Sequence, residues 1–124
     1  MHKVPPVSIL EVPATDAALR VEVRPSRDTV FLVLRGELDL ATVGVVASEI
    51  ATLRHAGFKR LVLDLRALEF MDSTGLALIV REHDAGPFAI VPGDGLPRRV
   101  LELTGLLDAI PHVRGRDVPL APAA

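Results

Sequence analysis

Between residues 19 and 23, apolar side chains alternate with Arg20 and Glu22, a period of two that is typical of a half-buried strand. Residues 30–34 are apolar without interruption, as in a strand that is covered on both faces. Between them lies the Pro-Ser-Arg-Asp sequence at residues 25–28, which is rich in turn-forming residues. The pattern therefore predicts a β-hairpin.

A helical period follows the hairpin. One apolar stripe keeps the i, i+3, i+4, i+7 spacing of a helix and contains Val43, Val46, Ala47, Ile50 and Leu53. Asp39 or Thr42 is expected to cap the start of this helix, and Gly57 follows its end. The sequence thus predicts a β-β-α unit in the first half of the chain.

The central stretch begins with an apolar strand at residues 61–65 and continues through a short connection that contains Glu69. A second helix is expected from Ser73 to the Asp-Ala-Gly-Pro sequence at residues 84–87, which would make it short. Its shared face is predicted to hold Leu76, Ile79, Val80 and His83.

The C-terminal part is predicted to add a strand at residues 88–91 and a third helix with Pro97 in its first turn. Leu96, Val100 and Leu103 are expected to line one side of that helix, which Thr104 and Gly105 end. A last short strand is predicted at residues 109–113. The Pro- and Ala-rich tail beyond it is expected to be loose.

Residues 1–16 hold three of the ten prolines; residues 8–12 could pair as an edge strand, but the segment is interpreted mainly as an extended arm. The order of elements indicates an α/β fold class, with a mixed (α+β) sheet of four to five strands and about three helices. Its later strands are expected to be parallel, because a helix joins each to the next. With 124 residues and no internal repeat, one domain is predicted.

Composition excludes several classes of function. Aromatic residues make up 3% of the chain and the net charge is −2, which argues against direct nucleic-acid binding. The chain has no cysteine, its four histidines lie far apart, and it has no glycine-rich phosphate loop, so neither a metal nor a cofactor is expected. No apolar run approaches the ~18 residues of a membrane span, and no signal sequence is recognised. The expected location is the cytoplasm.

The Asp-Ser-Thr-Gly sequence at residues 72–75 lies where the second helix should begin. Unpaired N–H groups and the helix dipole attract negative charge there, so Ser73 is a good position for a phosphate. The domain could accommodate the added charge of about −1.5 to −2, whereas an acidic group of a docked partner could not. Serine and aspartate are also common helix caps, so a purely structural role stays open.

Catalysis is the less favoured interpretation of the same residues. The aspartic protease signature has one residue fewer between Asp and Gly, and Ser73 lacks the glycines of a nucleophile elbow. No spacing of histidines suggests a triad with Ser73. The chain is therefore not expected to be an enzyme, although a hydrolase that uses Asp72 or Ser73 is kept as one hypothesis. Arg98 and Arg99 are interpreted as a solvated helix face or, less favoured, as part of a partner surface.

Three blocks occur in a familiar order: Leu-Arg-Gly-Glu-Leu-Asp at residues 34–39, Leu-Asp-Leu with Phe-Met-Asp-Ser-Thr-Gly-Leu at 63–76, and Arg-Arg-Val-Leu-Glu-Leu-Thr-Gly-Leu at 98–106. Together they closely resemble the STAS domain of bacterial anti-sigma factor antagonists, over about residues 19–113. The resemblance implies a small mixed sheet with helices packed on one face. Together with the composition of the two ends, it predicts an extended arm at 1–16, a single STAS domain at 17–114 and a loose tail at 115–124.

The resemblance also implies a phosphorylation switch. In that family the serine after the Asp of the motif, Ser73 here, is phosphorylated by a serine kinase that is also the anti-sigma factor. The unphosphorylated antagonist sequesters this partner and releases the sigma factor, and a phosphoserine phosphatase restores it. Asp72 would help the kinase to place the Ser73 hydroxyl, and Thr74 would provide the neighbouring hydroxyl of the motif. Asp39 and Gly75 would lie on the same partner-binding face.

Two departures from the family pattern bear on this function. The helix after Ser73 reaches its stop early, which could weaken the partner surface, and the N-terminal arm is longer than a minimal antagonist requires. The alternative is a STAS scaffold or small-ligand sensor in another signalling complex, with Ser73 merely a cap. Whether the domain forms a weak homodimer is left open.

Overall fold

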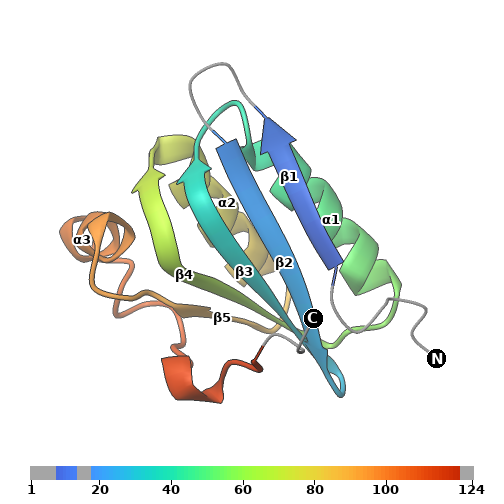
Figure 1. The fold of residues 1–124 in the computed structure, drawn as a ribbon. Coiled ribbons are helices and arrows are strands. Elements are labelled where there is room, and N and C mark those ends of the chain that lie inside the picture. The colour runs from blue at the N-terminus through green and yellow to red at the C-terminus, as the bar shows by residue number, and fades with distance from the viewer. Residues whose placement is uncertain (1–7, 14–17, 121–124) are drawn as a thin grey trace.

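The computed structural model describes residues 8–13 and 18–120. Within these residues, five strands form one sheet in the spatial order β1-β2-β3-β4-β5 (Figure 1). They are β1 (Ser8–Pro13), β2 (Ala18–Ser26), β3 (Thr29–Leu38), β4 (Arg60–Met71) and β5 (Phe88–Val91). β1, β2 and β3 pair antiparallel, whereas β3, β4 and β5 pair parallel. The mixed sheet and its parallel later strands, both predicted from element order, are confirmed.

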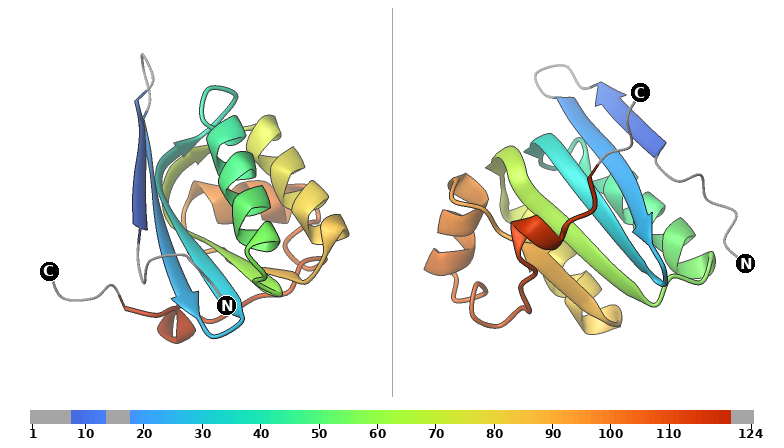
Figure 2. Two further views of the ribbon diagram at one scale, coloured as in Figure 1. Left: turned by 90° about the vertical axis from the view of Figure 1, so that its right-hand side faces the viewer. Right: turned by 60° about the horizontal axis from the view of Figure 1, so that its bottom comes forward.

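The helices α1 (Val43–His55), α2 (Ser73–Ala85) and α3 (Leu96–Leu103) lie on one side of the sheet (Figure 2). Alternate strand residues point toward them, as the period of two requires. The helices fill this core with Val46, Ile50, Leu53, Leu78, Ile79 and Leu101, and the sheet with Leu19, Val21, Val23, Val30, Leu32, Leu34, Leu61, Leu63, Leu65, Phe88 and Ile90. The packing of the helices on one face, which the resemblance implied, is confirmed.

The opposite face of the sheet carries a second, smaller apolar cluster. It consists of Phe31, Val33, Val62, Ala89, Val91 and Val118. Val118 follows the short 3-10 helix η1 (Gly115–Asp117), and the C-terminal segment crosses this face (Figure 2). Arg24 of β2 donates from Nη1 to the carbonyl oxygen of Pro119 at 2.8 Å. The expectation of a loose tail is therefore wrong as far as Pro119, because Val118 is buried and the backbone beside it is held by a guanidinium.

Two strands extend beyond their predicted limits. Residues 8–13, interpreted mainly as an arm, form β1 at the edge of the sheet. β4 continues to Met71, so the expected connection around Glu69 is strand, because β3 runs beside it as far as Leu38 and pairs with it. The remaining residues of the predicted arm and tail, 1–7, 14–17 and 121–124, lie outside the described residues.

The buried face of α2 differs from the predicted one. It contains Gly75, Leu78, Ile79 and Glu82. Val80 is exposed. Glu82 is buried on the face toward α1, beside Arg54. The Nε of Arg54 donates to Oε1 of Glu82 at 3.3 Å, and its Nη2 donates to the Glu82 carbonyl at 3.2 Å. The expectation of a short helix is also wrong, because α2 has 13 residues, as many as α1.

Of the stripe predicted for α3, Val100 packs against the core, but the other two positions are wrong. Pro97 and Leu101 are buried, whereas Leu96 and Leu103 are exposed. A helix of eight residues makes little more than two turns, so several stripes fit its sequence equally well. The strand predicted at residues 109–113 is reduced to one bridge between Ile90 and His112. A proline at position 111 has no N–H with which to continue a ladder.

Candidate functional site

The parallel pairing of β3 and β4 places the predicted site at one end of the sheet. β3 and β4 end side by side, with Leu38 opposite Met71, and the N–H of Asp72 donates to the carbonyl of Leu38 at 3.3 Å. The loop after β3 and the turn into α2 are therefore neighbours. Residues about 35 positions apart in the sequence are brought together in this way.

Asp72 is the N-cap of α2. Its Oδ1 accepts hydrogen bonds from the N–H groups of Thr74 at 2.9 Å and Gly75 at 3.2 Å, and from Oγ1 of Thr74 at 2.5 Å. Burial alone would raise the pKa of Asp72, but these bonds and one from the N–H of Leu40 outweigh it and lower the pKa. The carboxylate is thus held ionised and fixed in direction at the helix start.

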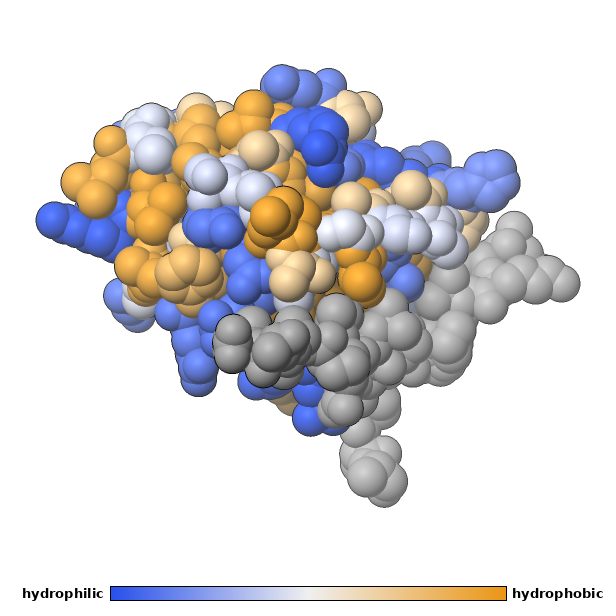
Figure 3. Space-filling view, turned by 90° about the horizontal axis from the view of Figure 1, so that it is seen from above, coloured by the Kyte–Doolittle hydropathy of each residue, from blue (hydrophilic) through white to orange (hydrophobic). Residues whose placement is uncertain are grey.

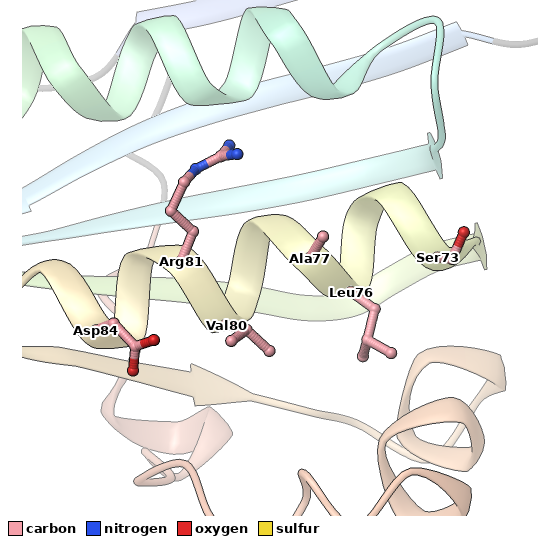
Figure 4. A pocket seen from close by; sticks show the side chains of 6 residues that line it. All are labelled: Ser73, Leu76, Ala77, Val80, Arg81 and Asp84. Carbon is pink, nitrogen blue, oxygen red and sulfur yellow. The ribbon is translucent and has the colours of Figure 1, made fainter.

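Ser73 stands at the first position of α2 and is exposed. Among the described residues, no hydrogen-bond partner is found for its hydroxyl, and the side chain projects from the open end of the helix (Figure 4). Ser73 is not the N-cap of α2, because Asp72 performs that role. The hydroxyl is free to meet another molecule.

Two of the first-turn N–H groups are already occupied. Those of Thr74 and Gly75 both bond to Asp72, so they are not available to a phosphate on Ser73 as the sequence argument supposed. An added phosphate would keep the benefit of the helix dipole and would share the turn with the Asp72 carboxylate. Its oxygens would therefore point toward solvent or toward a docked protein.

Gly75 is buried where the helix start approaches the strand ends. A Cβ at this position would lie 2.7 Å from Cγ of Met71 and 3.0 Å from Cγ of Leu38, closer than side chains tolerate. The glycine lets the first turn of α2 pack directly on β3 and β4. It places the Asp72–Ser73 turn without presenting a side chain of its own.

Asp39 lies in the loop that faces this turn and is half-buried. Its Oδ1 accepts from the N–H of Ala41 at 2.9 Å, and Oγ1 of Thr42 accepts from the N–H of Asp39 at 3.0 Å. Thr42 is the N-cap residue of α1, but its hydroxyl donates to the carbonyl of Glu37 and braces the loop instead of capping the helix. The loop thereby holds Leu40, which is 77% exposed, beside the Asp72 carboxylate.

An open groove of about 520 Å³ runs along α2 from Ser73 (Figure 4). It is lined by Ser73, Leu76, Ala77, Val80, Arg81 and Asp84. Figure 3 looks down on this end of the molecule and shows apolar patches among hydrophilic ones. Leu40 and Val80 are exposed apolar residues that the sequence analysis missed, whereas Leu76 is half-buried and packs against the core while it lines the groove. The available signal was an apolar residue inside a polar loop, and a second apolar stripe on α2 beside the buried one.

The groove was compared with the arrangements that hydrolases use. In the part of the chain that the structure describes, no histidine lines the groove, and Ser73 has no hydrogen-bonded base. No group of three or more His, Asp or Glu among the described residues could hold a metal ion. A search of the same residues finds no helix long and apolar enough to cross a membrane.

The family model of the STAS domain matches residues 20–117. The chain belongs to the STAS domain family. The STAS domain is similar to the anti-sigma-B factor antagonist of Staphylococcus aureus, with 30% identity over 89 residues that cover 67% of this chain and 82% of that protein.

Solved structures resemble the STAS domain as well. An anti-sigma factor antagonist from Mycobacterium paratuberculosis superposes with a TM-score of 0.70 at 27% identity, covering 80% of this chain and 87% of that one. The unphosphorylated form of the anti-sigma factor antagonist SpoIIAA superposes with a TM-score of 0.64 at 25% identity, covering 78% of this chain and 90% of that one. The phosphorylated form of the Bacillus protein SpoIIAA has a TM-score of 0.59 at 24% identity, covering 78% of this chain and 94% of that one. The STAS fold expected from the sequence is confirmed.

Proposed function

We propose that this protein is an anti-sigma factor antagonist, a binding module that sequesters an anti-sigma factor in the cytoplasm and catalyses no reaction itself. The observation that carries the proposal is the free Ser73 hydroxyl beside a fixed Asp72 carboxylate, at the head of an exposed apolar groove. Relatives and structural neighbours that share this fold are named anti-sigma factor antagonists.

The surface around Ser73 supports protein binding over small-molecule binding. Leu40 projects from the loop after β3, and Leu76 and Val80 line the groove on α2. Apolar side chains surrounded by charged ones form the usual pattern of a transient protein interface.

We propose that phosphorylation of Ser73 switches this interface. A kinase that is also the anti-sigma factor would add the phosphate, and a phosphoserine phosphatase would remove it. SpoIIAA, which shares the fold, has been solved in unphosphorylated and phosphorylated forms. The phosphate would repel an acidic group of the docked partner. Two unit charges of the same sign ~4 Å apart at an effective dielectric of ~20 repel by about 4 kcal/mol. Even half of that energy, after screening, weakens binding by more than tenfold.

The site residues have separate roles in this proposal. Asp72 caps α2 and orients the turn that offers Ser73 to the kinase, while Thr74 fixes the Asp72 carboxylate through its own hydroxyl. Asp39 shapes the loop that carries Leu40. Gly75 takes part through the close packing of the helix start, because it is buried.

The test uses the purified protein and its candidate anti-sigma kinase. Incubation with ATP should place one phosphate on Ser73, identified by mass spectrometry of peptides. Ser73→Ala should bind the kinase without being released by ATP, and Ser73→Asp should bind at least tenfold more weakly by calorimetry. Ser48→Asp is the matched control, because it adds the same charge on an exposed position of α1. Undiminished binding by Ser73→Asp would refute the switch.

A further inference from the structure

The face of the sheet that lies away from the three helices carries a segment of the chain itself. The C-terminal segment, residues 114–120, crosses this face (Figure 2), and Val118 completes the smaller apolar cluster there. The other members of the cluster come from β3, β4 and β5, and they are Phe31, Val33, Val62, Ala89 and Val91. The segment therefore lies on the sheet as a bound peptide would, except that it is covalently attached.

Few contacts hold the C-terminal segment in place. Val118 is its one buried side chain within the described residues. Among the same residues, one hydrogen bond joins it to the sheet, from Nη1 of Arg24 to the carbonyl oxygen of Pro119 at 2.8 Å. The N–H groups of Asp117 and Val118 bond within the segment, where they close its short 3-10 turn. A segment with so few buried contacts opens at a low free energy compared with the core.

The chain immediately before the segment is held much more firmly. The N–H of Ile90 donates to the carbonyl of Pro111 at 2.9 Å, and the N–H of Val113 donates to the carbonyl of Ile90 at 2.8 Å. Leu107 and Ile110 are buried in the main core. The segment can therefore leave the sheet by a rotation after Val113 while the rest of the domain stays folded.

The surface beneath the segment is preformed. Arg24 is 9% exposed, and its Nε and Nη2 donate to Oε2 of Glu22 at 3.1 and 2.6 Å. Burial alone would raise the pKa of Glu22, but hydrogen bonds from Arg24 and Arg35 outweigh it and lower the pKa. The ionised carboxylate thus fixes the guanidinium, whose Nη1 is left to bind a backbone carbonyl such as that of Pro119. A donor held in this way loses little freedom when a ligand binds.

Open space continues on both sides of the segment. Arg24 and Val33 line a hollow of about 260 Å³. Phe31 lines another of about 440 Å³, together with Asp117 of the segment. Because Val33 and Phe31 both belong to the cluster that Val118 completes, the segment fills the middle of a longer surface. A longer peptide would have room at either end.

We propose that this face of the sheet binds an extended peptide segment of a partner protein, and that the C-terminal segment is its built-in competitor. The docked segment shows what the site accepts: a small apolar side chain in the place of Val118 and, one residue later, a carbonyl that Arg24 binds. An added peptide binds only molecules whose own segment is open, so its apparent affinity falls with the open fraction. The site lies on the other side of the sheet from α2, and the inference does not depend on the proposed switch at Ser73.

The test uses the full chain and a synthetic peptide with the sequence of residues 113–120, Val-Arg-Gly-Arg-Asp-Val-Pro-Leu. Val118→Asp places a charge in the apolar cluster and should release the segment, which shifts the NMR amide signals of Phe31 and Val62. The peptide should bind this variant saturably and return those signals toward their wild-type positions. Binding to the wild type should be at least tenfold weaker. Adding Arg24→Gln to the released variant should weaken peptide binding about tenfold.

Leu120→Asp is the matched control, because it adds the same charge to the segment on a side chain that is 91% exposed. It should leave the segment docked and peptide binding as weak as in the wild type. A peptide that carries the Val118→Asp change should not bind, and Ser73→Asp should have no effect. Failure of the peptide to bind the released variant, or equal binding to the wild type, would overturn the proposal. Dimers of the released variant in sedimentation would place a second copy on the face and overturn it too.

Hydrogen exchange of the wild type tests the opening without any substitution. The amides of Asp117 and Val118 should exchange at least tenfold faster than that of Val113, which the bond to Ile90 holds. Equal exchange rates, or unfolding of the whole domain by Val118→Asp, would show that the segment is an integral part of the fold. Either result would rule out a detachable competitor.

Discussion

At the scale of single residues, the negative charge of Asp72 stabilises the start of α2 in two ways. It accepts two backbone N–H groups of the first turn, and it lies at the positive end of the helix dipole. The two effects differ in how far they depend on the charge of the carboxylate. The hydrogen bonds persist with any oxygen acceptor, whereas the dipole interaction needs the charge.

This difference gives a pH prediction. Because hydrogen bonds lower the folded-state pKa of Asp72 below its usual 3.8, its stabilising effect is present above that value and is lost as pH falls through the folded-state pKa. Asp72→Asn keeps an acceptor oxygen and should cost about 0.3–1 kcal/mol at neutral pH. In urea unfolding, the difference from the wild type should shrink as the pH falls below 3.8 and vanish once the folded-state carboxyl is protonated.

Asp72→Ala serves as the control, because it removes the acceptor as well. Asp72→Ala should lower the free energy of unfolding by about 1 kcal/mol at neutral pH. Most of this loss should remain in acid, because the protonated carboxyl of the wild type still accepts hydrogen bonds there. If the cost of Asp72→Asn were the same at every pH, the charge would have no part in the cap.

Some site residues could be predicted from sequence and others could not. The turn at residues 72–75 was found because capping is local: the acceptor and its N–H donors lie within three positions. The burial of Glu82 depends on Arg54, 28 positions away on another helix, and no periodicity contains that information. Val80 was assigned to the interior from helical spacing alone, and the structure exposes it.

At the scale of elements, the position of α2 on the sheet depends on the small size of Gly75. Gly75→Ala should destabilise the fold by about 1–3 kcal/mol, the usual cost of overpacking, because its Cβ would press on Met71 and Leu38. It should also weaken binding to the anti-sigma factor, since the turn that carries Ser73 would shift. Urea unfolding and calorimetry measure the two effects.

Gly44→Ala is the matched control for this change. Gly44 lies in α1, and nothing comes within 4 Å of a Cβ at its position. Alanine favours helix by up to about 1 kcal/mol over glycine, so this variant should be more stable than the wild type. Equal stability of Gly75→Ala and the wild type would show that the helix start is not closely packed.

At the scale of the whole molecule, the element order led to the correct sheet. The spacing of strands and helices was enough, since crossovers through helices impose parallel pairing. The C-terminal segment was not predictable. Its Pro- and Ala-rich composition is typical of a loose tail, and only the folded sheet reveals an apolar patch of five side chains that one valine can cover.

That cover should contribute measurably to stability. Val118 is 5% exposed and belongs to the apolar cluster on this face of the sheet, so Val118→Ala should cost about 1–2 kcal/mol in urea unfolding. Leu120→Ala removes a larger side chain that is 91% exposed, and should change stability by less than about 0.5 kcal/mol. Arg24→Met should add to the loss, because it frees the Pro119 carbonyl and removes the two hydrogen bonds from Arg24 to Glu22. Equal effects of the variants at positions 118 and 120 would mean that the segment is not docked on the sheet in solution.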